Sequence, residues 1–234
     1  MPQLQVKKTL SLITIAPGNL ADIPQFMTLT FDDAVHSLNW DAIVKSHQNH
    51  VNPNGCPVSA TLFVSTQYTD FWKIQTLYGL GHEIATHTVN HAAQPGLAEV
   101  QGARTILNTF AGVPKNQITG FRAPFLNTTK DTFKHVKDAG MAYDSSTTHM
   151  YVDQGIWPYT LDYGAANTCS PGSCEQPFAV PGLWEIPMAL LLNKDGSINS
   201  PMDPQPIGRI TTEETIELLK SNFLRHYNGN RSPM

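Results

Sequence analysis

Two segments of the sequence carry side chains that could hold a metal ion between them. One strand-like run ends at the adjacent carboxylates Asp32 and Asp33. A second run, Glu83–Thr86, is followed by His87 and His91, which are four residues apart. If the chain forms a helical turn there, both imidazoles lie on one face and can reach the same point. Zinc accepts carboxylate and imidazole as ligands, and three such ligands leave coordination positions open for catalysis.

Each of these pairs alone has a plainer explanation. Two carboxylates after a strand often form a turn or cap a helix, and two histidines four residues apart often lie on an exposed helix face. Their occurrence together at two strand ends favours a metal site at the C-terminal rim of a β/α fold. Because adjacent strand residues point to opposite sides, Asp32 and Asp33 should differ in role. One could bind the metal and the other could take a proton from the attacking water.

Further polar and aromatic groups follow later strand-like runs. Arg122 could pair with a carboxylate and hold it ionised, although a surface ion pair is an equally simple interpretation. Phe125 offers a backbone N–H that could stabilise an oxyanion. Asp144 could support a metal-binding residue or Arg122 by an outer contact, or it could equally well cap a helix or a turn. Trp157 could stack on a sugar ring, with packing in the core as the alternative. Glu185 is interpreted as structural.

Strand-like and helix-like segments alternate along most of the chain. Strands are expected at 26–31, 59–64, 83–86, 118–122, 141–145 and 183–192, and helices at 38–47, 69–80, 96–110, 128–139 and 211–228. The short links between them predict a parallel β/α fold, either a barrel or a doubly wound sheet. The segment 147–181 interrupts this alternation, and long loops of that kind usually carry function.

Length and composition narrow the possible classes of protein. The 234 residues suit one β/α domain. A net charge of −4 and the lack of a basic tract argue against nucleic acid and anionic membranes as partners. No apolar run approaches the roughly 18 residues of a membrane span. Cys169 and Cys174 bracket a turn-rich loop suited to a local disulfide, although two free thiols are possible, and Cys56 would then be unpaired.

Four ordered motifs resemble those of the polysaccharide deacetylases of carbohydrate esterase family 4, and most of all its animal-type chitin deacetylases. The matching segments are Thr30-Phe31-Asp32-Asp33, His87-Thr88-Val89-Asn90-His91, Arg122-Ala123-Pro124-Phe125, and Asp144-Ser145-Ser146 with Trp157. This resemblance implies a distorted parallel (β/α) barrel that binds one divalent cation, usually zinc. It also implies that the ligands are Asp33, His87 and His91.

The resemblance further implies roles for the remaining site residues. Asp32 would be the general base, held by Arg122, and the Phe125 N–H would help to hold the oxyanion. Trp157 and Asp144 would lie on the substrate-binding side. The reaction would be hydrolysis of N-acetyl groups of chitin or chito-oligosaccharides, with release of acetate. The alternatives are a non-catalytic chitin-binding protein and a deacetylase of another acetylated glycan, such as peptidoglycan or xylan.

Two departures from the family pattern stand out. The family commonly has Tyr at the position of Phe125. Its final Leu-x-His motif, which supplies a general acid, would follow Pro233, where this chain stops. We therefore expect an irregular segment at 1–20 and a catalytic domain at 21–234 that lacks its last strand. The resemblance implies an extracellular location, and the sequence does not indicate an oligomeric state.

Overall fold

A mostly parallel sheet forms the centre of the molecule in the computed structural model, which describes residues 19–148, 155–165, 172–173, 178–206 and 208–234. The strand order is β1-β2-β3-β4-β6-β9-β7, and only the pair of β7 with β9 is antiparallel. These strands are β1 (Thr30–Asp32), β2 (Thr61–Val64), β3 (Glu83–Thr86), β4 (Gly120–Phe121), β6 (Tyr143–Asp144), β7 (Tyr159–Thr160) and β9 (Trp184–Glu185).

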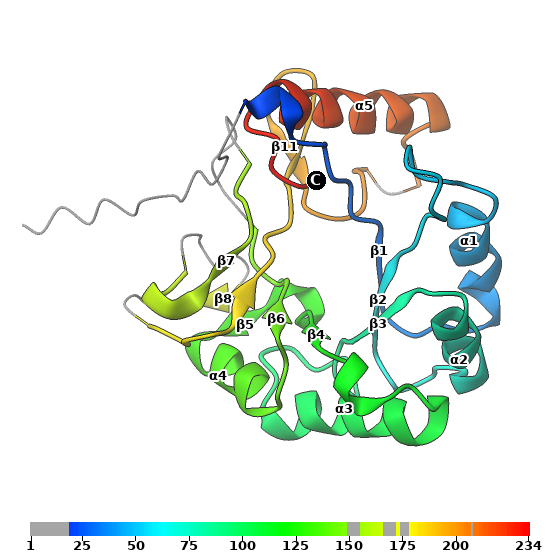
Figure 1. The fold of residues 1–234 in the computed structure, drawn as a ribbon, viewed down its shortest axis with the longest axis vertical. Helices are drawn as coiled ribbons and strands as arrows, with labels where there is room; N and C mark the ends of the chain where they lie inside the picture. The colour runs from blue at the N-terminus through cyan, green and yellow to red at the C-terminus, as the bar shows by residue number, and fades with distance from the viewer. Residues whose placement is uncertain (1–18, 149–154, 166–171, 174–177, 207) are drawn as a thin grey trace, which may run out of the picture.

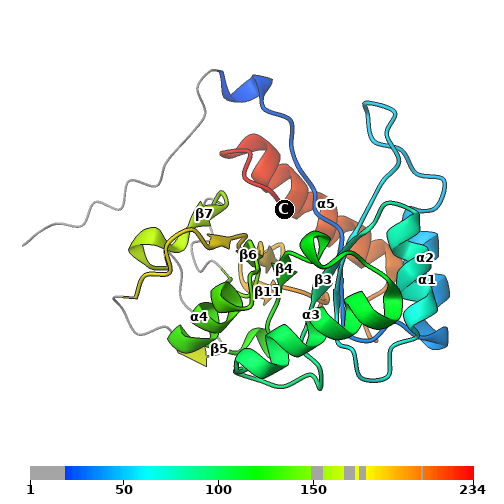
Figure 2. The ribbon, with the colours of Figure 1, turned by 60° about the horizontal axis from the view of Figure 1, so that its bottom comes forward.

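Helices lie on the outer side of this sheet, so that the elements form a ring in Figure 1. They are α1 (Ser37–His47), α2 (Phe71–Gly79), α3 (Leu97–Ala111) and α4 (Lys130–Asp138). The last helix, α5 (Thr212–Asn228), completes the ring and contacts β10 (Leu191–Leu192), which pairs with β11 (Ile198–Ser200) in a separate sheet. Figure 2 shows α1 to α4 following one another around the strands. The predicted distorted parallel (β/α) barrel is thus confirmed. None of the helices in the described part of the chain would span a lipid bilayer.

Apolar residues between the helices and the strands form the core. One cluster joins α1 and α2 to β2 and β3 through Ile43, Leu62, Val64, Ile74, Leu77 and Ile84. A second joins α3 and α4 to β4 through Val100, Phe121, Phe133 and Val136. In α3 the buried residues Val100, Ala103, Leu107 and Ala111 recur every three or four positions, the period of one helix face. The inner side of the strands carries polar side chains such as Thr30, Thr61 and Glu83 together with apolar ones such as Phe63.

Most predicted elements are present, but several are shorter than expected. In the predicted strand 26–31, only the end pairs with β2. The preceding residues instead contact the C-terminus, because Thr28 N–H donates to the Met234 carbonyl and Met234 N–H donates to the Phe26 carbonyl. The predicted strand 183–192 divides into β9 and β10 (Leu191–Leu192), which flank Pro187, a residue with no N–H for a ladder.

Small elements complete the description. They are β5 (Thr128–Thr129), β8 (Gly172–Ser173) and β11 (Ile198–Ser200), and the 3₁₀ turns Leu20–Asp22, Lys115–Gln117, Pro124–Leu126 and Leu161–Tyr163. Parts of the loop 147–181 lie outside the described residues, and so does the predicted Cys169–Cys174 disulfide. Cys56 is exposed and free.

Two buried histidines connect the end of α1 to the start of β3. His82 Nδ1 accepts the Ala60 N–H at 3.1 Å, so His82 carries its proton on Nε2. That N–H donates to His47 Nε2 at 2.9 Å. A further proton on either ring would put a donor where an acceptor is needed. Burial lowers the pKa of His82, and the neighbouring His47 lowers it further.

We expect this pair to make folding sensitive to acid. The unfolded chain binds a proton at His82 near its ordinary pKa of about 6.5, whereas the folded chain does so only at lower pH. The free energy of unfolding should therefore fall as the pH drops below about 6.5. Urea denaturation between about pH 7.5 and pH 5 measures this slope. In His82→Gln, whose amide can keep both hydrogen bonds without titrating, the slope should be smaller. An equal slope in both proteins would contradict the expectation.

Candidate active site

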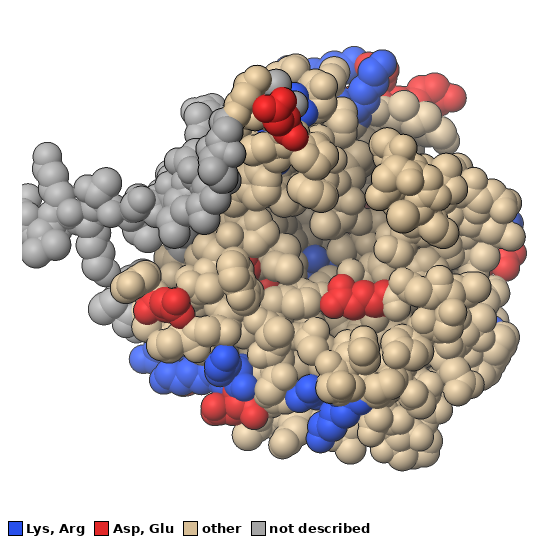
Figure 3. Space-filling view, in the orientation of Figure 1, with Lys and Arg blue, Asp and Glu red and all other residues tan. Residues whose placement is uncertain are grey.

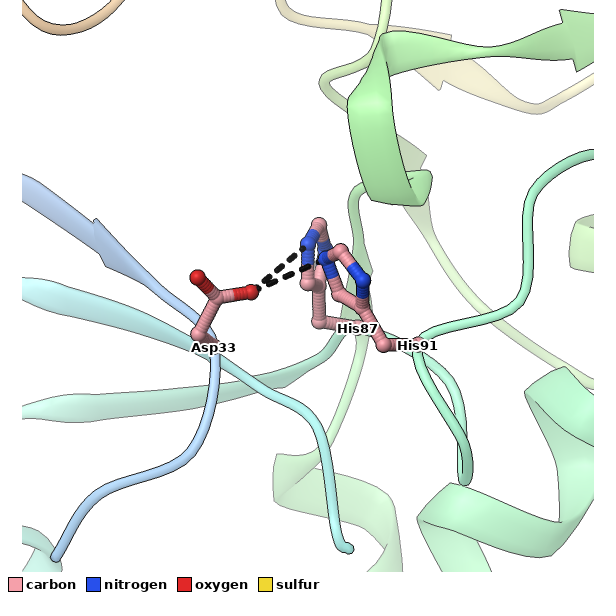
Figure 4. Close-up of side chains that lie close together, drawn as sticks. All are labelled: Asp33, His87 and His91. Carbon is pink, nitrogen blue, oxygen red and sulfur yellow. Dashed lines mark ion pairs between the residues drawn. The ribbon is translucent and has the colours of Figure 1, made fainter.

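Three side chains from the ends of β1 and β3, the two strands that flank β2, converge at one rim of the barrel. Asp33 follows β1, and His87 and His91 follow β3 (Figure 4). Asp33 Oδ1 lies 3.0 Å from His91 Nε2 and 3.6 Å from His87 Nε2. The ligand atoms of all three residues lie within 4.8 Å of one another, and no other described residues form such a group. The structure thus brings together the three side chains predicted as ligands, while metal binding itself stays a prediction.

His87 is held in the orientation that a metal ligand needs. Its Nδ1 lies 2.7 Å from the backbone carbonyl of Arg122. A carbonyl only accepts, so the proton is on Nδ1 and the lone pair of Nε2 points toward Asp33. The side chain is 2% exposed, and this burial lowers the pKa of His87 to about 4. The imidazole is therefore neutral near pH 7 and free to bind a cation.

The segment that carries the two histidines is not the helical turn that their spacing predicted. Thr88 and His91 have φ of +72° and +56°, in the left-handed region. This conformation is costly for a β-branched residue such as Thr88 and persists only where the surroundings enforce it. Glu99, in the first turn of α3, enforces it. Its Oε2 accepts the N–H groups of Val89 and Asn90 at 2.9 and 3.1 Å.

Glu99 is a functional candidate that the sequence analysis missed. Its Oε1 also accepts the side-chain amide of Asn90 at 3.0 Å, so one carboxylate holds three N–H groups of the loop between the histidines. The sequence feature that could have indicated this role is the acidic residue at the start of the helix that follows the histidine motif. Such a residue is usually explained by the helix dipole alone.

Asp32 lies beside the three-residue cluster and is paired with Arg122. Arg122 Nη1 lies 2.8 Å from Asp32 Oδ1, and Asp32 Oδ2 lies 3.9 Å from His87 Nε2. The adjacent carboxylates do not point to opposite sides, as a regular strand would require, because Asp33 has φ of +76°. Both therefore face His87. Burial raises the pKa of Asp32 above its ordinary value, and the charge of Arg122 offsets part of that rise.

Arg122 is fixed on every side. Its Nε and Nη2 donate to the backbone carbonyl and the hydroxyl of Ser145, both at 2.9 Å. Its Nη1 also donates to Thr30 Oγ1 at 3.0 Å, and its guanidinium lies 4.1 Å from the centre of the Phe63 ring. The side chain is 3% exposed. The alternative of a surface ion pair is therefore wrong.

A cavity of about 600 Å³ opens beside these residues inside the ring of strands. Its lining includes Asp32, Asp33, Arg122, Glu83 and Tyr143. Figure 3 shows the molecule hollowed at its centre on this face. Concave sites of this size, with a few fixed polar groups, are typical of small-ligand pockets. The cavity therefore reaches Asp32, Asp33 and Arg122.

The other predicted site residues differ in their surroundings. The Phe125 ring is 62% exposed, lies 4.5 Å from the His91 ring and sits on a backbone with φ of +58°. Trp157 is half-buried, its indole N–H donates to the Asn230 carbonyl at 3.2 Å, and it is not among the residues lining the cavity. Asp144 is completely buried, so the direct substrate contact predicted for it is wrong in this structure.

Comparison with known proteins bears on the class of this site. The family model described as polysaccharide deacetylase matches residues 21–143, a range that holds all of the acidic, histidine and arginine residues of the site. Chitin deacetylase 8 of Bombyx mori is 32% identical, with 94% of this chain and 62% of that protein covered. Chitin deacetylase 1 of the same organism is 30% identical, with 94% and 45% covered.

The same comparison covers solved structures. A putative polysaccharide deacetylase from Mycobacterium smegmatis aligns with 84% of this chain and 60% of its own, with a TM-score of 0.50 and 20% identity, which supports the fold. The chain spans between about half and two thirds of the length of the curated relatives it matches. Because the family model covers more than half of the sequence, this chain belongs to the polysaccharide deacetylase family.

Proposed function

We propose that this protein hydrolyses the N-acetyl groups of chitin or chito-oligosaccharides in a metal-dependent reaction that releases acetate. The observation that carries the proposal is the grouping of Asp33, His87 and His91 beside the Asp32–Arg122 pair. Membership of the family supports the deacetylase reaction. The two relatives named as chitin deacetylases support the substrate, and we propose an extracellular location on the same basis.

Asp33, His87 and His91 would hold the divalent cation, which we expect to be zinc. One carboxylate and two imidazoles form a donor set that suits zinc in an open catalytic site. The fixed Nδ1 proton of His87 also supports this assignment, because ligating histidines usually donate their second N–H to an oxygen acceptor. When bound, such an ion would polarise the carbonyl of the acetamide.

Asp32 would act as the general base. Arg122 engages Oδ1, so Oδ2, on the side of His87, remains to accept a proton from the attacking water. The water oxygen would form a bond to the acetyl carbon, and the bond between that carbon and the sugar nitrogen would then break. The nitrogen would take up the proton that Asp32 received from the water and leave as the amine, while acetate carries the new oxygen. The Phe125 N–H would help to hold the oxyanion, and Trp157 would lie on the substrate side.

Acetate release from a tetramer of N-acetylglucosamine, with and without zinc, tests the proposal. We expect zinc-dependent release by the wild type. His87→Ala should bind zinc at least about 100-fold more weakly, because loss of a ligand exceeds the effect of losing an outer contact, and should release little acetate. His50→Ala is the matched control, because His50 is an exposed histidine away from the cluster.

Two results would contradict the proposal. Tight binding of the tetramer without acetate release would indicate a non-catalytic chitin-binding protein. Release from acetylated xylan or peptidoglycan but not from the tetramer would indicate another glycan. Calorimetric zinc titration of the same three proteins separates failure of metal binding from failure of chemistry.

A further inference from the structure

Asp144 and Glu185 form a buried pair of acids that the proposed mechanism does not use. They are directly paired residues of the parallel strands β6 and β9, and neither side chain has any exposed surface. Phe121 of β4 lies in register on one side of the pair, and Tyr159 of β7 lies on the other. Both acids are thus buried inside the sheet, where two adjacent negative charges would be strongly unfavourable.

The hydrogen bonds show which of the two acids carries a proton. Both oxygens of Asp144 accept from Ser146, from its N–H and its hydroxyl, each at 2.8 Å. Glu185 Oε1 accepts from the N–H and hydroxyl of Thr147 at 3.2 and 2.7 Å. Glu185 Oε2 is buried and receives no hydrogen bond, whereas both Asp144 oxygens accept one, and the two acids are in-register neighbours on β6 and β9. The geometry therefore puts the proton on Oε2 of Glu185, which donates to an ionised Asp144.

Burial and the neighbouring charge agree with this assignment. Burial raises the pKa of Glu185 well above its ordinary value, and the charge of Asp144 raises it further. Burial also raises the pKa of Asp144 to about 6, which leaves it the stronger acid of the two.

The segment that binds this acid pair also contacts Arg122 and the turn that follows it. Ser146 Oγ, which donates to Asp144, accepts the N–H of Ala123 at 2.8 Å. Ser145, which lies between Asp144 and Ser146 in the sequence, fixes Arg122 through its carbonyl and hydroxyl. The acid pair, the loop after β6 and the Arg122–Phe125 turn therefore form one connected network. A change in the pair would move Arg122 and, through it, Asp32.

We propose that Glu185 is a positioning residue for deacetylation, acting as a protonated carboxylic acid that donates to Asp144 and so holds the loop that fixes Arg122. This inference rests on the proposed function for its effect on rate, but the protonation of Glu185 stands independently of it. The titratable groups next to Glu185 are its in-register neighbours, Asp144 from β6 and Tyr159 from β7, and the charge of Arg122, beyond the end of β4, acts on Asp144. Loss of the proton would set two carboxylates against each other, with Arg122 already paired to Asp32.

The decisive comparison is between two substitutions that look equally mild. Glu185→Gln keeps an N–H donor toward Asp144 and an oxygen acceptor toward Thr147, so kcat near pH 7 should stay within about threefold of wild type. Asp144→Asn would turn an N–H group toward Ser146 donors or toward the Glu185 proton. Its kcat should fall by about 10- to 100-fold, because small displacements of catalytic groups are costly. Substrate does not touch either residue, so KM should change little.

The pH profile separates positioning from a purely structural role. The wild type should lose kcat on the alkaline side as Glu185 ionises, whereas Glu185→Gln should extend to higher pH because its donor cannot ionise. Superimposable profiles, or a greater loss in Glu185→Gln than in Asp144→Asn, would overturn the proposal. If the wild type releases no acetate, infrared spectroscopy still tests whether Glu185 is protonated. The C=O band of a neutral carboxylic acid should be present at pH 7 in the wild type and absent in Glu185→Gln, and its absence from the wild type would also overturn the proposal.

Discussion

An Asp32→Asn variant should release acetate about 10²–10⁴-fold more slowly than the wild type, the usual cost of removing a general base. The amide keeps the size of the side chain and an oxygen for Arg122 Nη1, which now bonds Oδ1 at 2.8 Å. It cannot take a proton from water at neutral pH. The loss should therefore appear in kcat, and KM should be nearly unchanged, because the altered group acts in the transition state.

Asp33→Asn is the matched control for this experiment. It changes the neighbouring carboxylate in the same way, but Asp33 Oδ1 is the atom that faces both His87 and His91. We expect Asp33→Asn to lose zinc affinity and Asp32→Asn to keep it, as measured by calorimetric titration. An Asp32→Asn variant that retains its rate, or that loses zinc as completely as Asp33→Asn, would remove Asp32 from the role of base.

Much of the site could be predicted because it lies at the ends of parallel strands. Asp33 and His91 are far apart in the sequence, yet β1, β2 and β3 run in one direction in consecutive register. Any polar residue directly after these strands must then emerge on one rim. The same reasoning located Arg122 after β4. The strand pattern and the polar residue at its end were sufficient, and exact strand lengths were not needed.

The local geometry could not be predicted, because it depends on backbone conformations that the residue types disfavour. Asp33, Thr88, His91 and Phe125 all adopt positive φ without being glycine. Distant contacts, such as those of Glu99 with the histidine loop, enforce these conformations. The i, i+4 spacing of the histidines thus led to the wrong local structure but to the right residues.

Glu185 illustrates a second limit of sequence reasoning. A glutamate in an apolar strand indicates a buried partner, but the sequence does not name it. The partner is Asp144, 41 positions earlier, and it is found only from the register of β6 against β9. The interpretation of Glu185 as structural was made without that register. The proposed proton on Glu185 follows only once the groups that donate to each acid, Ser146 and Thr147, are known.

The largest effect on stability is expected for Arg122→Ala. Removing the guanidinium leaves Asp32 with a side chain 9% exposed and without its ion-pair partner. Breaking a buried ion pair from one side costs about 3–5 kcal/mol, and the hydrogen bonds to Ser145 and Thr30 are lost as well. Urea denaturation at neutral pH should show a corresponding decrease in the free energy of unfolding. In the exposed pair of Lys45 with Asp41, at 3.6 Å, Lys45→Ala should have little effect.

The pH dependence of the stability of Arg122→Ala, together with a double variant, distinguishes the effect of an unpaired Asp32 carboxylate from a general loss of packing. Without Arg122, the pKa of Asp32 should rise further above its value in the unfolded chain. The folded variant then binds the Asp32 proton more tightly than the unfolded chain does, so the raised pKa destabilises the fold only as the pH rises above the unfolded pKa. The loss of stability in Arg122→Ala should therefore be smallest near pH 4. Adding Asp32→Asn to Arg122→Ala removes the orphaned carboxylate and should restore part of the stability at neutral pH. If the two losses simply add and do not vary with pH, Arg122 stabilises the barrel by packing against Phe63, and Asp32 does not depend on it for its charge.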